Sequence, residues 1–387
     1  MRSFTVDERR TRLARRHFLS GSAAASIGDI TAAVVGLHAT DPATPYLSLW
    51  ARLPGFSIAD LDADLYERRA LVKHLAMRRT LWVVRADDLR VIQSGASDRV
   101  ADNERRRLIA DVQKAGVAAD GSQWLERACA AVVAHLAQHG ATSARDLRAA
   151  LPELAGTFDP APGKRWGGET PLAPRVLTAM AVRGDIVRGP NDGAWTVSRP
   201  RWAPMADWLR AAVEVEPAEV ARAELVRTWL RAFGPATVTD IKWWFGNTLT
   251  WARHALRDTE AVEVDLDGVP GFALPDDLEP EPPVEPWGAL LPGLDVTTMG
   301  WFDRDWYLGE HRGHVFDTNG NGGTTAWWNG RIVGGWGQDA DGKVEITLLE
   351  DIGRDGKRVL DRRADELTEW LRGVRVSPRF PSPLSKL

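Results

Sequence analysis

Apolar residues recur at helical spacing through the first part of the chain, and a strand pattern follows them. Residues 30–37 form an apolar helical stretch, and Asp41 and Pro42 give the next segment the start signature of a second helix. Helical spacing continues through residues 61–75, and a β-branched, aromatic strand pattern occupies residues 76–89. Three helices closed by a strand are typical of a winged helix.

The same order of elements returns twice. After an Arg-rich helix, residues 123–150 predict two helices, and residues 171–200 predict a third helix and a hairpin with an Asn-Asp-Gly turn. Residues 220–258 again predict three helices separated by Gly-Pro and Gly-Asn, and residues 262–275 supply the strand pair. We therefore predict three tandem winged-helix units, with an unrelated helix-rich array as the alternative.

A Pro- and acid-rich segment, residues 275–286, marks a boundary. Beyond it, short alternating strands with Asn-Gly and Asp-Gly turns predict a small barrel or sandwich, closed by a last helix that packs through Leu360, Leu367 and Leu371. The expected fold class is α+β, with three tandem winged-helix units and a small C-terminal β-barrel that carries a terminal helix. The predicted domains are residues 1–115, 116–205, 206–280 and 285–387.

Charge is distributed unevenly along the 387 residues, although the net charge is only −4. Residues 1–250 carry 34 Lys and Arg against 28 Asp and Glu, whereas residues 251–387 carry 15 against 25. This asymmetry indicates that the first two-thirds faces a polyanion. The alternative is a local acidic loop, because five acidic residues cluster among the prolines: Asp276, Asp277, Glu279, Glu281 and Glu285.

Several classes of site are excluded. Cys129 is the only cysteine, so an intrachain disulfide or a multi-cysteine metal site cannot form, and a reducing compartment fits. No apolar run has the length of a signal-peptide core or a bilayer span, so we expect a cytoplasmic protein without a membrane partner. No long apolar repeat indicates a coiled coil, and a monomer is the default expectation.

The motifs that would indicate nucleotide hydrolysis, dinucleotide binding, zinc proteolysis or a serine hydrolase do not occur. His311 and His314 would lie on opposite faces of a strand, so we predict no metal there. His38 and Thr40 lie two residues apart in a segment between two helices, so their side chains can project in the same direction and share a water molecule. The alternative is structural, with Asp41 capping the next helix.

Basic residues border the predicted units. One group surrounds the first strand pair and is suited to phosphate contact: Arg68, Arg69, Lys73, Arg78 and Arg79. Arg105, Arg106 and Arg107 form a second run on a helix, and Lys242 and Trp243, in the third repeat, are also predicted to contact DNA. The alternative for each run is a solvated helix face.

Four segments together resemble a known family. They are VVGLHATDPATPYLSLWARL, LVKHLAMRRTLWVV, LLPGLDVTTMGW and VFDTNGNGGTTAWWNGRIVGGW, and they cover nearly the whole chain in a characteristic order. The chain resembles the tandem winged-helix proteins related to the AlkZ and YcaQ bacterial DNA glycosylases. The resemblance implies three winged helices and a C-terminal β-barrel around damaged duplex DNA, excision of bulky or crosslinked N7-alkylated purines, and no metal or cofactor.

The resemblance also implies site residues, with one departure. A Gln-x-Gln or Gln-x-Asp pair in the family aligns with His38-Ala39-Thr40, so His38 replaces the first glutamine and Thr40 replaces the second member of the pair. In these positions His38 would position a water molecule and Thr40 would support it. Asp41 lies one residue beyond the position of the family's aspartate. Arg78 and Arg79 would hold backbone phosphates. The segment that contains Asp295 and Thr298 would approach the lesion.

The predicted function is that of a monofunctional DNA glycosylase that hydrolyses the N-glycosidic bond of N7-alkylated purines in double-stranded DNA. One alternative is a non-catalytic winged-helix DNA-binding or regulatory protein that keeps the scaffold. A second alternative is that the winged helices serve protein contacts.

Overall fold

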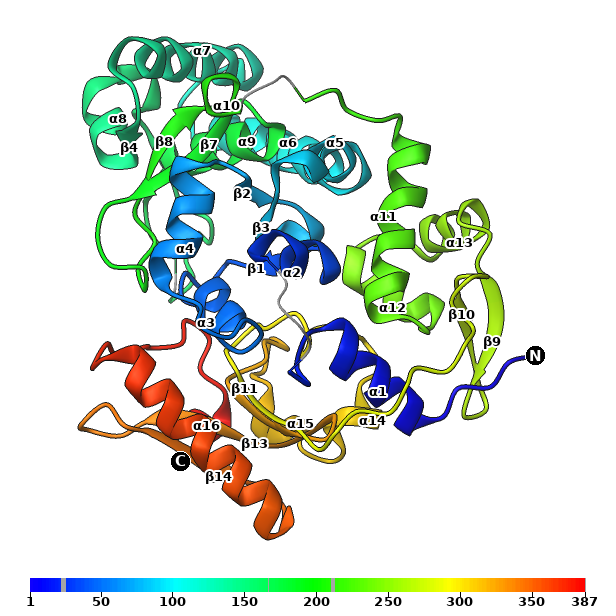
Figure 1. Cartoon of the computed structure of the whole chain (residues 1–387). Helices are drawn as coiled ribbons and strands as arrows, with labels where there is room; N and C mark the ends of the chain where they lie inside the picture. Colours follow the sequence, from blue (N-terminus) through cyan, green and yellow to red (C-terminus); the bar gives the residue numbers. More distant parts are fainter. Residues whose placement is uncertain (22–25, 166, 210–212, 387) are drawn as a thin grey trace. The chain divides into compact units, whose positions relative to one another are not determined.

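The computed structural model describes residues 1–21, 26–165, 167–209 and 213–386. The chain divides into two compact units (Figure 1). Unit 1 contains Met1–Asp62, Trp82–Arg85 and Arg222–Leu387, and unit 2 contains Ala63–Leu81 and Ala86–Ala221. The four domain ranges expected from the sequence stay a prediction.

Helices make up most of the regular structure. Their bounds are α1 Val6–Arg16, α2 Ile27–Ala33, α3 Thr44–Trp50, α4 Ile58–Asp62, α5 Leu89–Ile92, α6 Asp98–Lys114, α7 Gly121–His139, α8 Ala144–Ala150, α9 Ala173–Arg183, α10 Met205–Trp208, α11 Ala218–Phe233, α12 Val238–Phe245, α13 Leu249–Asp258, α14 Asp305–Leu308, α15 Arg312–Val315 and α16 Gly353–Leu371. Short 3₁₀ or π-helical turns occupy Ala63–Glu67, Met77–Arg79, Ala86–Asp88, Gln93–Ser97, Pro152–Leu154 and Pro383–Lys386.

The strands are short. Their bounds are β1 Leu37–His38, β2 Leu71–Leu75, β3 Leu81–Arg85, β4 Thr142–Ser143, β5 Thr157–Phe158, β6 Thr170–Pro171, β7 Ile186–Asn191, β8 Pro200–Pro204, β9 Val262–Leu266, β10 Val269–Ala273, β11 Gly288–Leu291, β12 Thr325–Trp328, β13 Arg331–Gln338 and β14 Val344–Leu348.

Unit 2 contains the second predicted repeat. The helix before Gly140, the Ser143 N-cap of α8 and the left-handed Gly184 after α9 are confirmed. Strands β4, β8 and β7 form an antiparallel sheet in that order. The apolar faces of α7, α8 and α9 meet in one core, which includes Leu136 and Leu177. The sequence predicted the three helices and the hairpin in this order, but not the short strand β4 between α7 and α8.

Unit 1 contains the third repeat with the same order. Helix α11 is followed by a bridge between Ala236 and Phe272, then by α12, α13 and the β9–β10 hairpin. Thr237 and Asp240 form a capping box at the start of α12. The hairpin turns at Asp267 and Gly268, which both have positive φ, as a two-residue type I′ turn requires.

The first repeat differs from its predicted form. Leu71–Leu75 is a strand, not the end of a helix, because the helical turns stop at Glu67 and Arg69 has the positive φ of 56°. The apolar stretch at 30–37 also breaks, since α2 ends at Ala33 and β1 follows. Helix α3 begins at Thr44, so Asp41 lies in the turn before the helix and is not its N-cap.

The C-terminal part is an open sheet and not a closed barrel. Strands β11, β12, β13 and β14 pair antiparallel in that order, and the pairing of the described strands does not return from β14 to β11. The Asn329-Gly330 turn joins β12 to β13 as predicted. Helix α16 lies against β11 and β14 and buries Leu360, Leu367 and Leu371, which confirms that prediction (Figure 1).

The acidic segment at 275–286 is fastened to the N-terminal helix α1. Asp277 accepts hydrogen bonds from Arg12 at 3.0 Å and from Arg16 at 2.7 Å, and Glu281 accepts from Arg16 at 2.9 Å. Asp276 pairs with Arg231. Three of the clustered carboxylates therefore balance arginines within unit 1, which supports the local explanation of the charge asymmetry.

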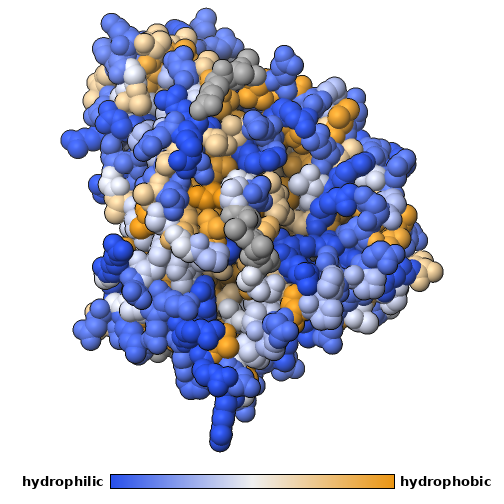
Figure 2. Space-filling view, in the orientation of Figure 1, coloured by the Kyte–Doolittle hydropathy of each residue, from blue (hydrophilic) through white to orange (hydrophobic). Residues whose placement is uncertain are grey.

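Hydrophilic residues cover most of the face in Figure 2, and apolar residues form smaller patches among them. Among the described residues, none of the helices has both the length and the hydropathy that crossing a bilayer requires.

Candidate functional site

The His38–Asp41 segment is built at the end of β1 in unit 1. Strand β1 pairs with β3, and His38 lies opposite Trp82. The imidazole packs edge-on against the Trp82 indole with a centroid distance of 5.1 Å, and Trp82 in turn contacts Trp244 at 5.3 Å. His38 is 7% exposed and Thr40 is half-buried. The Trp82 ring, packed against Trp244, therefore orients the imidazole, and a small part of the surface of His38 stays exposed.

His38 and Thr40 lie close together, through a contact between the imidazole and the Thr40 backbone. The Thr40 backbone N–H lies 3.5 Å from His38 Nδ1, at the long limit of a hydrogen bond. A neutral imidazole has one donor nitrogen and one acceptor nitrogen, and the Thr40 hydroxyl can both donate and accept. The pair can therefore orient a water molecule either by donating or by accepting a hydrogen bond.

Asp41 has a positioning role in this geometry. Its Oδ1 accepts a hydrogen bond from the Ala43 N–H at 3.0 Å, and its Oδ2 accepts from the Arg379 N–H at 2.8 Å. Thr44 donates to the Gly293 carbonyl at 2.7 Å. The turn that follows Thr40 is therefore held by backbone groups of the C-terminal part of the chain, at Gly293 and Arg379.

A buried ion pair supports α3. Asp295 accepts hydrogen bonds from Arg52 at 2.7 and 2.9 Å and from Ser48 at 2.6 Å, and neither Arg52 nor Asp295 has an exposed side chain. Burial opposes ionisation of Asp295, but the Arg52 charge and these hydrogen bonds outweigh it and hold its pKa below the ordinary value. Burial, together with the Arg52 charge, lowers the pKa of the adjacent His17 to about 3.

Two residues expected to approach DNA, Asp295 and Thr298, are fully buried. Thr298 shares a hydrogen bond with Thr325, and its carbonyl accepts from Tyr307. Because their polar atoms are occupied by protein partners, we assign both residues to the support of the site.

Arg78 and Arg79, which belong to unit 2, form the tip of the turn that follows β2. Both are exposed and both have positive φ, 55° and 60°. The turn is closed by hydrogen bonds between Ala76 and Thr80 and between Thr80 and Met77. Left-handed backbone costs of order 1 kcal/mol for each residue other than glycine, and such strain often accompanies function. Arg79 also forms a bidentate ion pair with Glu104.

The other predicted cations of unit 2 lie on several elements. Arg68 is exposed and pairs with Asp64 at 2.6 Å. Arg69 stacks on Trp208 with 4.3 Å to the ring centroid and donates to the carbonyl groups of Asp207 and Trp208. Lys73 donates to the Tyr66 hydroxyl at 2.9 Å. Arg69 and Lys73 thus have roles in local packing in addition to their charge.

Lys242 and Trp243 lie on α12 in unit 1. Lys242 is exposed, Trp243 is half-buried beneath Arg304, and the following Trp244 is buried. The helix therefore turns one tryptophan into the core and the other toward its surface, as helical spacing predicts.

His311 and His314 flank or belong to the one-turn helix α15 rather than a strand, and His311 contacts Glu350. Among the described residues, no group of three or more His, Cys, Asp or Glu is arranged to hold a metal ion. The prediction that His311 and His314 lie on opposite faces of a strand was wrong, because this segment is helical.

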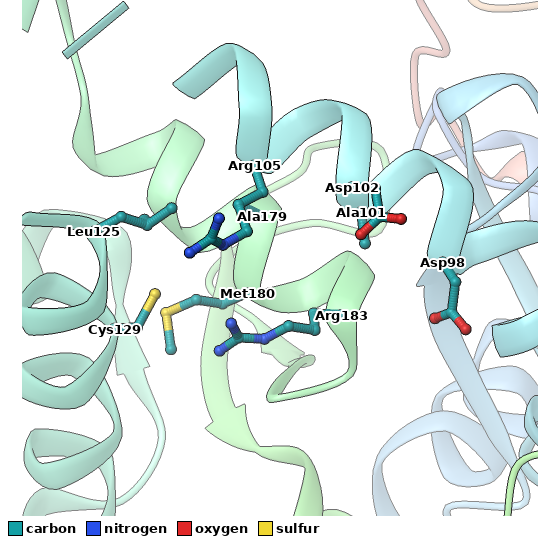
Figure 3. A pocket seen from close by; sticks show the side chains of 9 residues that line it. All are labelled: Asp98, Ala101, Asp102, Arg105, Leu125, Cys129, Ala179, Met180 and Arg183. Atoms are coloured by element: carbon teal, nitrogen blue, oxygen red, sulfur yellow. The ribbon is translucent and has the colours of Figure 1, made fainter. Parts of the chain in front are cut away.

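A cavity of about 260 Å³ lies between α6, α7 and α9 of unit 2 (Figure 3). The guanidinium groups of Arg105 and Arg183 extend toward the side of the cavity where Cys129 and Met180 lie. Arg183 is paired with Asp185, and Arg105 donates to Ser122. Burial raises the pKa of the Cys129 thiol to about 11, which keeps the thiol protonated and weakly nucleophilic. The thiol is therefore not a reactive group of this cavity.

The contacts of two residues of the site, Trp82 and Arg379, were not predicted from the sequence. Trp82 was recognised as part of a strand but not as the neighbour of His38, and the pairing of β1 with β3 makes them neighbours. Arg379 lies 338 residues from Asp41 in a Pro-rich tail, and no periodicity or spacing relates the two.

Comparisons with known proteins agree with this architecture. The family model described as "DNA glycosylase AlkZ-like" matches residues 31–370. Among solved structures, the Streptomyces sahachiroi DNA glycosylase AlkZ is similar, with a TM-score of 0.74, 19% sequence identity, and coverage of 97% of this chain and 99% of that chain. No curated protein matches the sequence. The chain belongs to the AlkZ-like family of DNA glycosylases.

Proposed function

We propose that this protein is a monofunctional glycosylase that hydrolyses the N-glycosidic bond of N7-alkylated purines in duplex DNA. The observation that carries the proposal is the meeting of His38 and Thr40 beside the Trp82 ring, in a chain of the AlkZ-like family. We interpret the three helix–strand–helix–helix–hairpin repeats as winged-helix units that bind the duplex. Arg78, with Lys242 in the other unit, would contact backbone phosphates.

The chemistry requires few protein groups. An N7-alkylated purine carries positive charge, so when the bond between C1′ and N9 breaks, the electron pair neutralises the departing base. The oxygen of a water molecule then bonds to C1′ of the oxocarbenium-like sugar, and a neutral His38 imidazole accepts the proton that this water loses. Thr40 contributes a second hydrogen bond that holds the water in line.

Duplex DNA with one defined N7-alkylguanine tests the proposal, and alkaline cleavage reveals abasic sites. We expect His38→Ala to slow base release by about 100-fold or more, the scale of one general base, with duplex affinity nearly unchanged. His38→Gln, which restores the glutamine of the family pattern, should retain activity. His139→Ala, at the exposed end of α7, is the matched control and should behave as the wild-type protein.

The second candidate is a DNA-binding protein without catalysis. It is favoured by the low exposure of His38, 7%, and by the replacement of both glutamines of the family pattern. Absence of abasic product with both small and bulky adducts, together with salt-dependent duplex binding, would establish this alternative and refute the glycosylase proposal.

A further inference from the structure

The C-terminal tail, residues 374–386, reaches the candidate catalytic segment. The Arg379 backbone N–H donates to Asp41 Oδ2 at 2.8 Å, and Arg379 Nη1 donates to the Thr40 carbonyl at 3.3 Å. Both partners belong to unit 1. The match to the family model ends at residue 370, so the tail lies beyond the part that defines the family.

The tail is anchored on both sides of Arg379. Before it, Gln338 donates to the Val374 carbonyl at 3.0 Å and accepts from the Val376 N–H at 2.9 Å. After it, Ser382 and Leu384 are buried, and Ser382 packs so closely that a Cβ on Gly323 would lie 2.3 Å from its Oγ. The prolines at 378, 381 and 383 restrict the backbone further. The position of Arg379 therefore does not depend on its own side-chain contacts.

The charge of Arg379 has no carboxylate partner within ion-pair distance among the described residues. Its side chain is exposed and makes its hydrogen bond with a carbonyl oxygen, and its guanidinium lies 5.8 Å from the centre of the Phe380 ring. The Asp41 carboxylate is instead satisfied by two backbone N–H groups. An exposed guanidinium with unused donors, carried by an anchored backbone, is well suited to a phosphate group.

We propose that Arg379 binds a backbone phosphate of the DNA strand that presents its nucleotide to His38 and Thr40, while its backbone N–H positions Asp41. The duplex is taken from the proposed function, but binding of the strand does not require that base release occurs. The tail thus supplies one phosphate contact and one positioning contact at the same place.

The phosphate contact is tested with duplex DNA that carries a stable tetrahydrofuran abasic analogue, bound at several salt concentrations. Loss of one phosphate contact should reduce the slope of log K against log salt by about 1 in Arg379→Ala. Arg379→Lys should restore the slope. Arg358→Ala is the charge-matched control, because Arg358 is an exposed residue of α16 that pairs with Asp355, and it should leave the slope unchanged. An unchanged slope and affinity in Arg379→Ala would overturn the phosphate contact.

The positioning contact is tested by amide hydrogen exchange of peptides that cover residues 37–47. Arg379→Ala keeps the backbone N–H, whereas Arg379→Pro removes it. We expect faster exchange in this segment for the proline variant, with the rest of unit 1 unchanged. Equal exchange in the two variants would refute the role in positioning. Neither measurement uses base release, so both stay decisive if the protein proves to lack glycosylase activity.

Discussion

Replacing Asp295 by Asn is expected to destabilise the protein strongly, because the change leaves a buried cation without its anion. The carboxylate accepts two hydrogen bonds from Arg52, one from Ser48 and one from the Thr297 N–H at 2.9 Å, and both members of the ion pair are fully buried. An asparagine turns an NH₂ group toward a donor in at least one of these contacts. Removal of one partner from a buried pair costs about 3–5 kcal/mol in the free energy of unfolding.

Urea unfolding at pH 7 measures this loss, and a domain's total stability of about 5–15 kcal/mol makes it easy to detect. Asp305→Asn, an exposed aspartate of α14, is the matched control and should change the free energy by less than about 0.5 kcal/mol. Removing both charges, with Arg52→Met and Asp295→Leu together, should recover part of the loss. A change below about 1 kcal/mol in Asp295→Asn, combined with weaker DNA binding, would refute the buried role and favour the DNA contact expected from the sequence.

Three further predictions concern stability and its relation to DNA binding. Burial lowers the pKa of His74 to about 4 in the folded protein. As the pH falls, the unfolded chain therefore binds the proton first, and the free energy of unfolding should decrease by about 3 kcal/mol between about pH 6.5 and pH 4. Urea titrations of His74→Gln should show a smaller decrease over this range, and an equally large decrease would contradict the assignment. Asp277→Asn removes the anion that Arg12 and Arg16 share and should lower the free energy of unfolding by about 2 kcal/mol. Proteolysis of the α1 segment should become faster, and unchanged proteolysis would show that other contacts hold α1. Arg78→Gly relieves the strain of a left-handed backbone, so the free energy of unfolding should stay unchanged or rise by up to about 1 kcal/mol. Duplex binding should weaken in the same variant, and undiminished binding would remove Arg78 from the DNA contacts.

Local sequence signals predicted most individual elements. Capping residues and stop glycines act on their own helix, so the ends of α7, α9 and α12 follow from Gly140, Gly184 and Gly246. Leu71 and Leu75 fit a helix as well as a strand, for a physical reason. Residues four apart lie on one face of a helix and also on one face of a strand, so their spacing alone cannot separate the two.

Closure of the C-terminal sheet could not be predicted in the same way. Alternating residues and Asn-Gly turns specify strands and hairpins, but a barrel also requires hydrogen bonds between its first and last strands. Here α16 covers the sheet through Leu360 and Leu367, and the described sheet ends at β11 and β14.

By itself the sequence determined most of the helices, the hairpins, the order of helices in the second and third repeats and the nearness of His38 to Thr40, because each depends on residues within a few positions of one another. Tertiary structure decided that Trp82 supports the imidazole, that Asp295 is buried on Arg52, and that Arg379 meets Asp41. These partners are separated by 44 to 338 residues, and such contacts form only when packing brings distant segments together.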